Sequence, residues 1–195
     1  MRRMLFAAVL VACGLAAHAA TITYTGIVTA TGSLNGTAFT NALLTLQATA
    51  DSSTITSAAQ GTSGSMLYIA PTLTFGGNVA GLGAFNLASG MTFDNQRQGN
   101  AGFTSSTGAD ILDIVNSFFS TYDLKSAVSL TGSPLFNATS TATLDRGNLI
   151  LSNLGSTATF QAQLTPAAVT PEPSSFALLA TGLVGIGGLL RKRLA

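Results

Sequence analysis

Residues 21–25 read Thr-Ile-Thr-Tyr-Thr, a strict alternation of hydroxyl-bearing and large apolar side chains. Successive side chains of a β-strand point to opposite faces, so the threonines share one face while Ile22 and Tyr24 share the other. The same alternation recurs at residues 72–75, 141–144 and 157–160, which read TLTF, TATL and TATF. Threonine and apolar residues at this period predict strands with one solvated face and one buried face.

Short runs of Gly, Asn, Ser and Pro separate these alternating segments. Such runs are typical of turns, and they lie at residues 32–36, 61–64, 76–78, 99–100, 132–134 and 145–148. They divide residues 20–165 into roughly eight to ten short strands. Short alternating strands at these intervals favour antiparallel pairing over a parallel α/β sheet. We therefore predict a mainly β body with the fold of an antiparallel β-sandwich.

One segment of the body, residues 110–125, has the spacing of a helix. Its apolar residues recur at intervals of three and four, and they are Ile111, Ile114, Val115, Phe118, Phe119 and Tyr122. Asp110 and Asp113 at the start and Lys125 at the end would complement the dipole of a helix. We therefore predict one amphipathic helix that closes an open end or edge of the sandwich. The alternative is a helix that binds a partner.

Residues 1–19 have the three parts of a secretory signal peptide. A basic start is followed by an apolar run over residues 4–17 and by the small-x-small cleavage site Ala17-His18-Ala19. Cleavage at this site would make Ala20 the first residue of the exported protein. The alternative is a loose lipobox that ends at Cys13, which would then be acylated and become the first residue.

A proline-rich linker at residues 166–175 follows the predicted body. Next come fifteen uncharged residues at 176–190 and a basic end at 191–195, which contains Arg191-Lys192-Arg193. A helix of this length rises about 22 Å, short of the roughly 30 Å hydrocarbon core of a bilayer. We therefore predict a short transmembrane helix that anchors the chain temporarily, with the basic cluster in the cytoplasm and the body outside.

Three elements of this tail occur in a characteristic order. Pro171-Glu172-Pro173, the glycine-rich apolar stretch and the basic cluster resemble the PEP-CTERM sorting signal. The resemblance implies recognition by an exosortase, a membrane protease that cuts near Pro-Glu-Pro and passes the protein to the cell surface or exopolysaccharide matrix. Tails of this kind are also labelled as an ice-binding protein C-terminal domain, a label that describes the tail alone. The alternative is an ordinary C-terminal anchor.

The body itself, notably residues 23–46, is similar to uncharacterised domains that often accompany PEP-CTERM tails. This resemblance implies no activity.

Charge is concentrated at the two ends of the chain. Only 8% of the 195 residues are charged, and five of the eight basic residues lie at positions 2–3 and 191–193. Between residues 20 and 170 there are three basic and six acidic residues, a net charge of −3. A sparsely charged and mildly acidic body has no basic patch for phosphates, so nucleic acid is not an expected partner.

Few side chains of the body could carry catalysis or hold a cofactor. His18 and Cys13 are the only histidine and cysteine, and both lie in the predicted signal peptide. Their loss would remove Ser-His-Asp triads, imidazole acid-base catalysis and zinc bound by histidine or cysteine. We therefore expect neither an enzyme nor a cofactor.

Calcium is the metal that the remaining side chains could hold. Asp and Asn residues at 94–95, 110–113 and 145–148 offer hard oxygen ligands in or near predicted loops. Such residues usually bond the backbone of their own turn instead, so we predict no metal site.

The leading functional hypothesis is a non-enzymatic cell-surface or extracellular-matrix protein. Its expected partners are the export machinery, signal peptidase, an exosortase-like membrane protease and exopolysaccharide. A carbohydrate-binding module is the alternative, although the body has no Trp and only three Tyr to stack on sugar rings. Ice binding would require a regular Thr-x-Thr array, and no fixed period runs through the sequence. An enzyme is the third alternative.

Overall fold

The computed structural model describes residues 20–62, 64–105, 108, 110–136, 141–145, 147–165 and 182. This part of the chain contains twelve strands and two short 3₁₀ helices. The strands are β1 (Thr21–Leu34), β2 (Thr37–Asp51), β3 (Thr56–Gln60), β4 (Ser65–Pro71), β5 (Thr74–Val79), β6 (Gly83–Asn86), β7 (Gly90–Asn95), β8 (Asn100–Ser105), β9 (Asp110–Val115), β10 (Val128–Leu135), β11 (Thr141–Leu144) and β12 (Gly147–Thr165). The 3₁₀ helices are η1 (Ser52–Thr54) and η2 (Ser117–Ser120).

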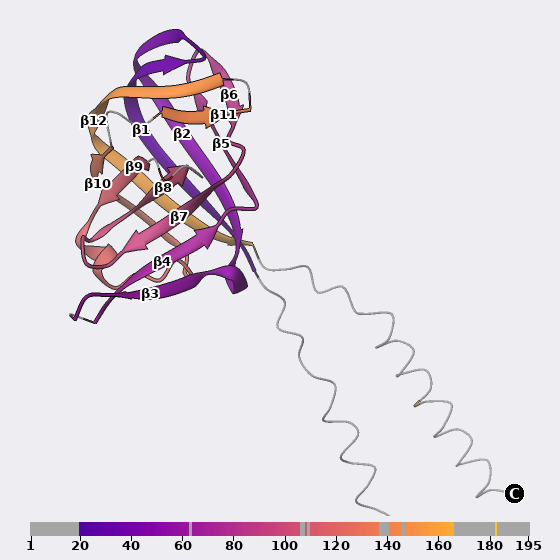
Figure 1. The fold of residues 1–195 in the computed structure, drawn as a ribbon, viewed down its shortest axis with the longest axis vertical. Helices are drawn as coiled ribbons and strands as arrows, with labels where there is room; N and C mark the ends of the chain where they lie inside the picture. Colours follow the sequence, from indigo (N-terminus) through magenta and orange to yellow (C-terminus); the bar gives the residue numbers. More distant parts are fainter. Residues whose placement is uncertain are drawn as a thin grey trace, which may run out of the picture.

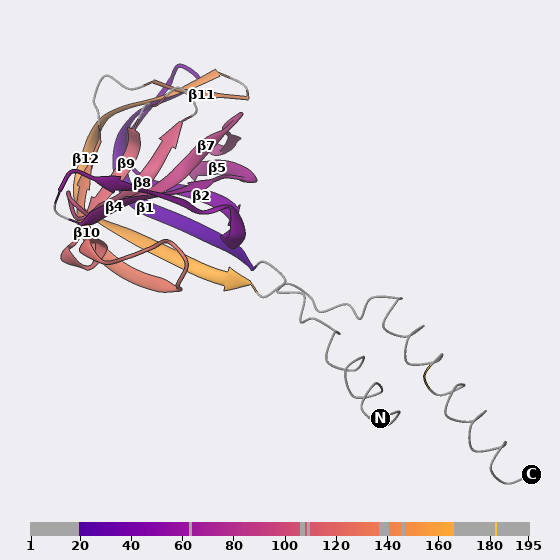
Figure 2. The same ribbon diagram turned by 60° about the horizontal axis from the view of Figure 1, so that its bottom comes forward.

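The strands form one continuous antiparallel sheet. Their order is β3-β4-β7-β8-β9-β10-β12-β1-β2-β5-β6, and β11 pairs with the first residues of β12. The sheet curls, so that β1, β2 and β12 face β7, β8 and β9 (Figures 1 and 2). The prediction of a mainly β, antiparallel fold is confirmed. The two separate sheets of a sandwich are replaced by two facing halves of a single sheet.

Strand β10 joins the two halves. Residues 128–132 pair with β12, whereas residues 133–135 pair with β9. Gly132 lies where the strand passes from one partner to the other, and a Cβ atom at this position would collide with the carbonyl oxygen of Val115. Glycine commonly marks such a close approach of two backbones. The Gly-Ser-Pro run at 132–134 is therefore a bend within a strand, where the sequence predicted a turn.

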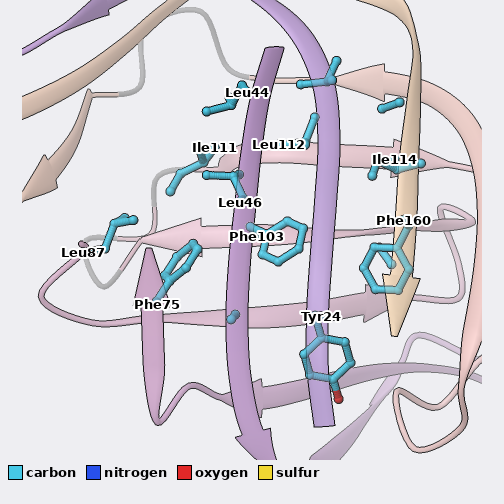
Figure 3. Packing of buried hydrophobic residues seen from close by; sticks show 14 of the residues in the cluster. Tyr24, Leu44, Leu46, Phe75, Leu87, Phe103, Ile111, Leu112, Ile114 and Phe160 are labelled. Carbon is cyan, nitrogen blue, oxygen red and sulfur yellow. The ribbon is translucent and has the colours of Figure 1, made fainter. Parts of the chain in front are cut away.

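The hydrophobic core lies between the two halves. Figure 3 shows Tyr24 of β1, Leu46 of β2 and Phe160 of β12 in the same cluster as Phe103 of β8 and Leu112 of β9. All five side chains are fully buried. Because both halves contribute, the curled sheet closes on side chains from strands that are distant in sequence.

Aromatic side chains form the centre of this core around Phe160. The Phe160 ring lies 5.3 Å from the ring of Phe119 in an edge-to-face arrangement. The rings of Tyr24 and Phe103 lie 6.2 Å from it, and that of Tyr122 lies 6.3 Å from it. Each distance is within the range at which aromatic pairs attract beyond their burial. Phe160 therefore links the two halves of the sheet and the segment after β9.

The alternation that opens the body is confirmed along β1. Ile22 and Tyr24 are fully buried, while the threonines between them lie on the opposite, more exposed face. The segments at 141–144 and 157–160 lie in β11 and β12 as predicted. The segment at 72–75 joins a strand only at Thr74, and Leu73 is exposed where the alternation predicted a buried side chain. The hairpin between β1 and β2 turns at Asn35 and Gly36, whose φ angles are 53° and 80°. Positive φ at both positions is what a two-residue hairpin turn requires, and Asn-Gly is a favoured pair there.

The predicted amphipathic helix at residues 110–125 is wrong. The segment begins with β9, continues into η2 and then runs without regular structure to β10. Four successive residues of β9, from Ile111 to Ile114, are buried, so side chains on both faces of this strand are shielded from solvent. Asn116 ends the strand because its side-chain oxygen accepts a hydrogen bond of 2.9 Å from the N–H of Phe118. A strand buried on both faces can thus imitate helical spacing.

Several predicted segments lie outside the described residues. They are the signal peptide at 1–19, the linker at 166–175, the transmembrane helix at 176–190 apart from Gly182, and the basic end at 191–195. Within the described part of the chain, no helix has the length and apolar character needed to span a bilayer.

Candidate functional site

The two ends of the folded body lie side by side. Thr21 at the start of β1 pairs with Thr165 at the end of β12, and both strands end at one corner of the domain (Figures 1 and 2). Ala20 is held at this corner, because its N–H donates to Ser52 Oγ at 3.1 Å and its carbonyl accepts from the Ser52 N–H at 3.0 Å. We call this corner the exit end. Of the predicted cleavage residues, Ala20 lies here, while Ala17 and Ala19 lie outside the described residues.

The outward residues of six neighbouring strands form an uncharged polar surface, here called the polar face. Residues that pair across antiparallel strands share a face, so the pairing arranges these residues in rows. The central row is Ser129, Gln161, Thr25, Gln47, Gly76 and Asn86, from β10, β12, β1, β2, β5 and β6. The row nearer the exit end is Gln163, Thr23, Thr49 and Thr74, and the row beyond the centre is Thr131, Thr159, Ile27, Thr45, Asn78 and Ala84.

The polar face is hollowed near both ends of its central row. Near β6, a hollow of about 530 Å³ is lined by Gln47, Asn78 and Asn86 among others. Near β10, a hollow of about 370 Å³ is lined by Ser129 and Gln161 among others. The threonine alternation in the sequence indicated a polar face, but the rows depend on strand order and register, which the sequence did not reveal.

A glycine shapes the larger hollow. A Cβ atom at Gly76 would collide with the backbone carbonyl oxygen of Phe85 and press against the side-chain oxygen of Asn86, both on the neighbouring strand. Without it, the Asn86 amide lies across β5 and donates a long hydrogen bond of 3.4 Å to Asp145 Oδ2. The hollow therefore has a backbone floor with amide and hydroxyl groups around it.

Comparison with known families identifies the tail that follows the exit end. Residues 169–193 match the PEP-CTERM protein-sorting motif. The match begins shortly after β12 ends at Thr165, and it includes Pro171-Glu172-Pro173 and Arg191-Lys192-Arg193. All six of these residues lie outside the described residues. No significant match was found among curated proteins or among solved structures.

The PEP-CTERM motif marks an exported protein that passes through the membrane and is sorted by an exosortase. The resemblance predicted for the tail is thereby confirmed, and an exosortase is the kind of partner that it implies. The match ends at residue 193 and covers no part of the body, so the similarity of the body to other domains stays a prediction. The PEP-CTERM tail and the polar face thus occupy separate parts of the chain.

The carboxylates considered as calcium ligands are dispersed over the fold. Asp110 Oδ1 accepts a bond of 3.0 Å from the Thr104 hydroxyl, and Asp113 Oδ2 accepts one of 2.9 Å from the Asn100 amide. Asp145 lies beside Asn86 at the other end of the sheet. Among the described residues, no group of three His, Cys, Asp or Glu side chains is placed to hold a metal ion.

We expect the stability of the protein to be independent of calcium. Because no three carboxylates of the described residues lie together as ligands for one ion, removal of calcium should leave the melting temperature unchanged within error. Thermal unfolding with and without a chelator measures this. A melting temperature that falls by many degrees on chelation, and returns on addition of calcium, would show a bound ion.

One acidic side chain is buried in the core with no hydrogen-bond partner among the described residues. Asp94 and Thr92 of β7 lie on the same side of the strand as the core residue Phe103, because Thr92 pairs with Phe103 and Asp94 with Ala101. Neither side chain is exposed to solvent, and within the described part of the chain their oxygens accept or donate no hydrogen bond. Burial raises the pKa of the Asp94 carboxyl to about 8, and the charge of Asp123 adds to this effect.

A second buried acid lies on the opposite side of the same half of the sheet. Asp113 pairs with Gly102, where the missing Cβ makes room for the carboxylate over β8. Burial raises the pKa of Asp113 to about 7; the charge of Asp110 raises it further, and the hydrogen bond from Asn100 opposes the shift. Sequence reasoning considered both acids only as loop ligands. Only their burial distinguishes them, and no sequence signal revealed it.

We predict that the protein is more stable in mild acid than in mild alkali. An unfolded aspartate ionises near its ordinary pKa of 3.8, whereas folded Asp94 keeps its proton up to about pH 8. Between these values the folded state binds more protons, so the free energy of unfolding falls as the pH rises. The pKa of Asp94 is not lowered by a lysine or arginine among the described residues. Its charge interacts with the titratable groups of Asp123 and Tyr122.

The test is the melting temperature of wild type and Asp94→Asn between about pH 5 and pH 8. The amide has the same shape and cannot ionise, so the variant should lose much of the decline and melt higher at the alkaline end. A smaller decline of the melting temperature with pH should remain in the variant, because the pKa of Asp113 is also raised. A wild-type melting temperature that rises across this interval contradicts the prediction.

Proposed function

We propose that this protein is a non-enzymatic component of the cell surface or extracellular matrix. Its β domain is exported under the signal peptide at 1–19, held in the inner membrane by residues 176–190 and then released or attached outside. The observation that carries the proposal is the position of the PEP-CTERM motif, which begins at residue 169, immediately downstream of the final strand. The folded body is thus the part of the chain that an exosortase would deliver.

The engagement of the acidic side chains supports a non-enzymatic role. Asp51 caps η1 by accepting bonds from the N–H and hydroxyl of Ser53, at 2.7 Å each. Asp123 accepts a bond of 2.9 Å from the N–H of Lys125. The remaining four are buried or bonded as described above. A pair of carboxylates that works as acid and base would instead converge on one open cleft.

The polar face supports carbohydrate binding as a second candidate function. Amide groups from Gln47, Asn78 and Asn86 surround one hollow, and binding pockets for small molecules commonly fix their ligands through a few such convergent polar groups. Exopolysaccharide is the partner that this role would imply in a matrix.

Processing in two otherwise identical hosts, one with an exosortase and one without, tests the proposed function. We expect a shortened protein at the surface or in the medium of the first host, and the full-length chain in the inner membrane of the second. Immunoblots of the fractions, with an unrelated inner-membrane protein as control, measure this. If the protein has the same size and occurs in the same fraction in both hosts, the tail would be an ordinary C-terminal anchor. Screening the released protein on ester, peptide and glycoside substrates tests the non-enzymatic role, which reproducible turnover would contradict.

We predict that the exported protein begins at Ala20. Signal peptidase selects small residues at the positions that Ala17 and Ala19 occupy, and Ala20 then remains docked on Ser52 at the exit end. N-terminal sequencing of the exported protein measures the start. A chain that begins with lipidated Cys13 would overturn this prediction in favour of a lipoprotein.

A further inference from the structure

We propose that the central row of the polar face binds a single extended chain of a neutral polysaccharide. The inference rests on the proposed function in one respect, since it assumes that the body works outside the cell where such chains occur. It goes further by assigning the ligand class and the residues. Ser129, Gln161, Thr25, Gln47 and Asn86 are the side chains that would contact the chain, with Gly76 between the last two.

The dimensions of the row suit an extended chain. Its members come from six adjacent strands, and neighbouring strands lie about 4.8 Å apart, so the row is about 24 Å long. This length accommodates several consecutive sugar units laid across the strands. A compact ligand would use one hollow, whereas this row leads from the hollow near β10 to the hollow near β6.

The chemistry of the row matches hydroxyl groups. An amide side chain presents both a donor and an acceptor, as a sugar hydroxyl does. Within the described part of the chain, the amides of Gln47 and Gln161 make no hydrogen bonds, so their donors and acceptors are available to a ligand. Ile27 in the neighbouring row adds one apolar side chain that could cover the C–H face of a sugar.

Charge selects neutral chains over acidic ones. The three rows contain no charged side chain, and two carboxylates lie beside them: Asp51, which pairs with Thr21 at the exit end, and Asp145, which contacts Asn86. Both would repel a uronate or sulfate. A basic side chain, which would favour an anionic polysaccharide, is absent from the rows.

Binding to the purified full-length chain in detergent tests the site independently of sorting. Affinity electrophoresis in gels containing cellulose ether, mixed-linkage β-glucan, galactomannan or dextran, with alginate as the acidic comparison, measures retardation. We expect retardation by at least one neutral polymer and none by alginate. Because hydrogen bonds are the main contacts, each is worth about fivefold in affinity, and the double variant Gln47→Ala, Gln161→Ala should weaken retention at least tenfold.

The matched control is Gln60→Ala on β3, which removes the same amide from the opposite end of the sheet order. It should bind as wild type does, and the melting temperatures of all variants confirm that they fold. A Thr25→Lys variant gives a second reading, because a long charged side chain in the middle of the row should obstruct a chain that crosses it.

The proposal fails if no neutral polymer retards the protein, or if the double variant binds as well as Gln60→Ala. It also fails if ice growth, observed in the same preparation, is inhibited by the wild type and not by Thr25→Lys, because the face would then bind ice. These outcomes are independent of the proposed function. A protein that is correctly sorted but binds no polysaccharide would refute the site alone, and one that binds but is not cleaved would refute the sorting alone.

Discussion

Replacing the sorting motif by Pro171→Ala, Glu172→Gln and Pro173→Ala is expected to trap the full-length chain in the inner membrane of a host with the cognate exosortase. Proline disfavours a helix at the residue before it, so we expect the two prolines to leave the motif accessible to a protease. Without these residues the apolar segment should remain attached to the body. We expect almost complete loss of the shortened external form, measured by immunoblotting of membrane and extracellular fractions.

The basic cluster offers a contrasting variant. Neutralising Arg191, Lys192 and Arg193 would remove the charges that are expected to hold the end of the tail in the cytoplasm, and only the fifteen-residue apolar segment would then oppose transfer. We expect inefficient sorting with loss of the tail from the membrane, a different result from the accumulation caused by the first variant. If the wild type and the Pro-Glu-Pro variant show identical sizes and fractions in a host with a proven exosortase, the motif is only an anchor.

Phe160→Ala is expected to destabilise the body by about 3–5 kcal/mol, the typical cost of truncating a buried aromatic residue. The ring is fully buried and lies next to four other aromatic rings, which come from β1, β8 and the segment around η2. Its loss would leave a cavity where the two halves of the sheet meet. For a domain of this size the melting temperature should fall by about 10 °C or more.

Phe118→Ala is the matched control, because the same atoms are removed from a neighbouring aromatic residue that is 45% exposed. Phe118 contacts the rings of Phe119 and Tyr122 at the margin of the cluster, so we expect a loss of about 1 kcal/mol or less. Thermal or denaturant unfolding of both variants gives the comparison. Equal losses would show that the centre of the core lies elsewhere.

The alternation in the sequence predicted strands at three of the four segments, because side-chain period is a local property of an extended backbone; the exception is 72–75, and the predicted turn run that follows it at 76–78 lies inside β5. Thr21 to Thr25 indicated which face of β1 is buried, and the Asn35-Gly36 turn fell in a predicted turn run. Strand order and register could not be predicted, since they depend on contacts between residues far apart in sequence. The rows of the polar face, and the passage of β10 between two partners at Gly132, are therefore visible only in the structure.

The helix prediction for the segment from Asp110 to Lys125 failed for a related reason. Its buried residues were mostly identified correctly, for Ile111, Ile114, Phe119 and Tyr122 are all in the core. The spacing of the apolar residues was misleading, because β9 buries side chains on both of its faces and a turn capped by Asn116 follows it. Burial of Asp94 was also beyond sequence reasoning, since an aspartate at a strand end has the sequence character of a loop residue.

The pairing of Thr21 with Thr165 has a mechanical consequence. A domain tethered through the end of β12 receives tension along that strand, which is flanked by β1 on one side and β10 on the other. Force along a strand shears many hydrogen bonds together, and forced unfolding is limited by the rate at which such a set breaks. The central row crosses β12 and β1 directly, so a load between a held polysaccharide and the tether would pass through these strands and spare β3, β4, β7 and β8.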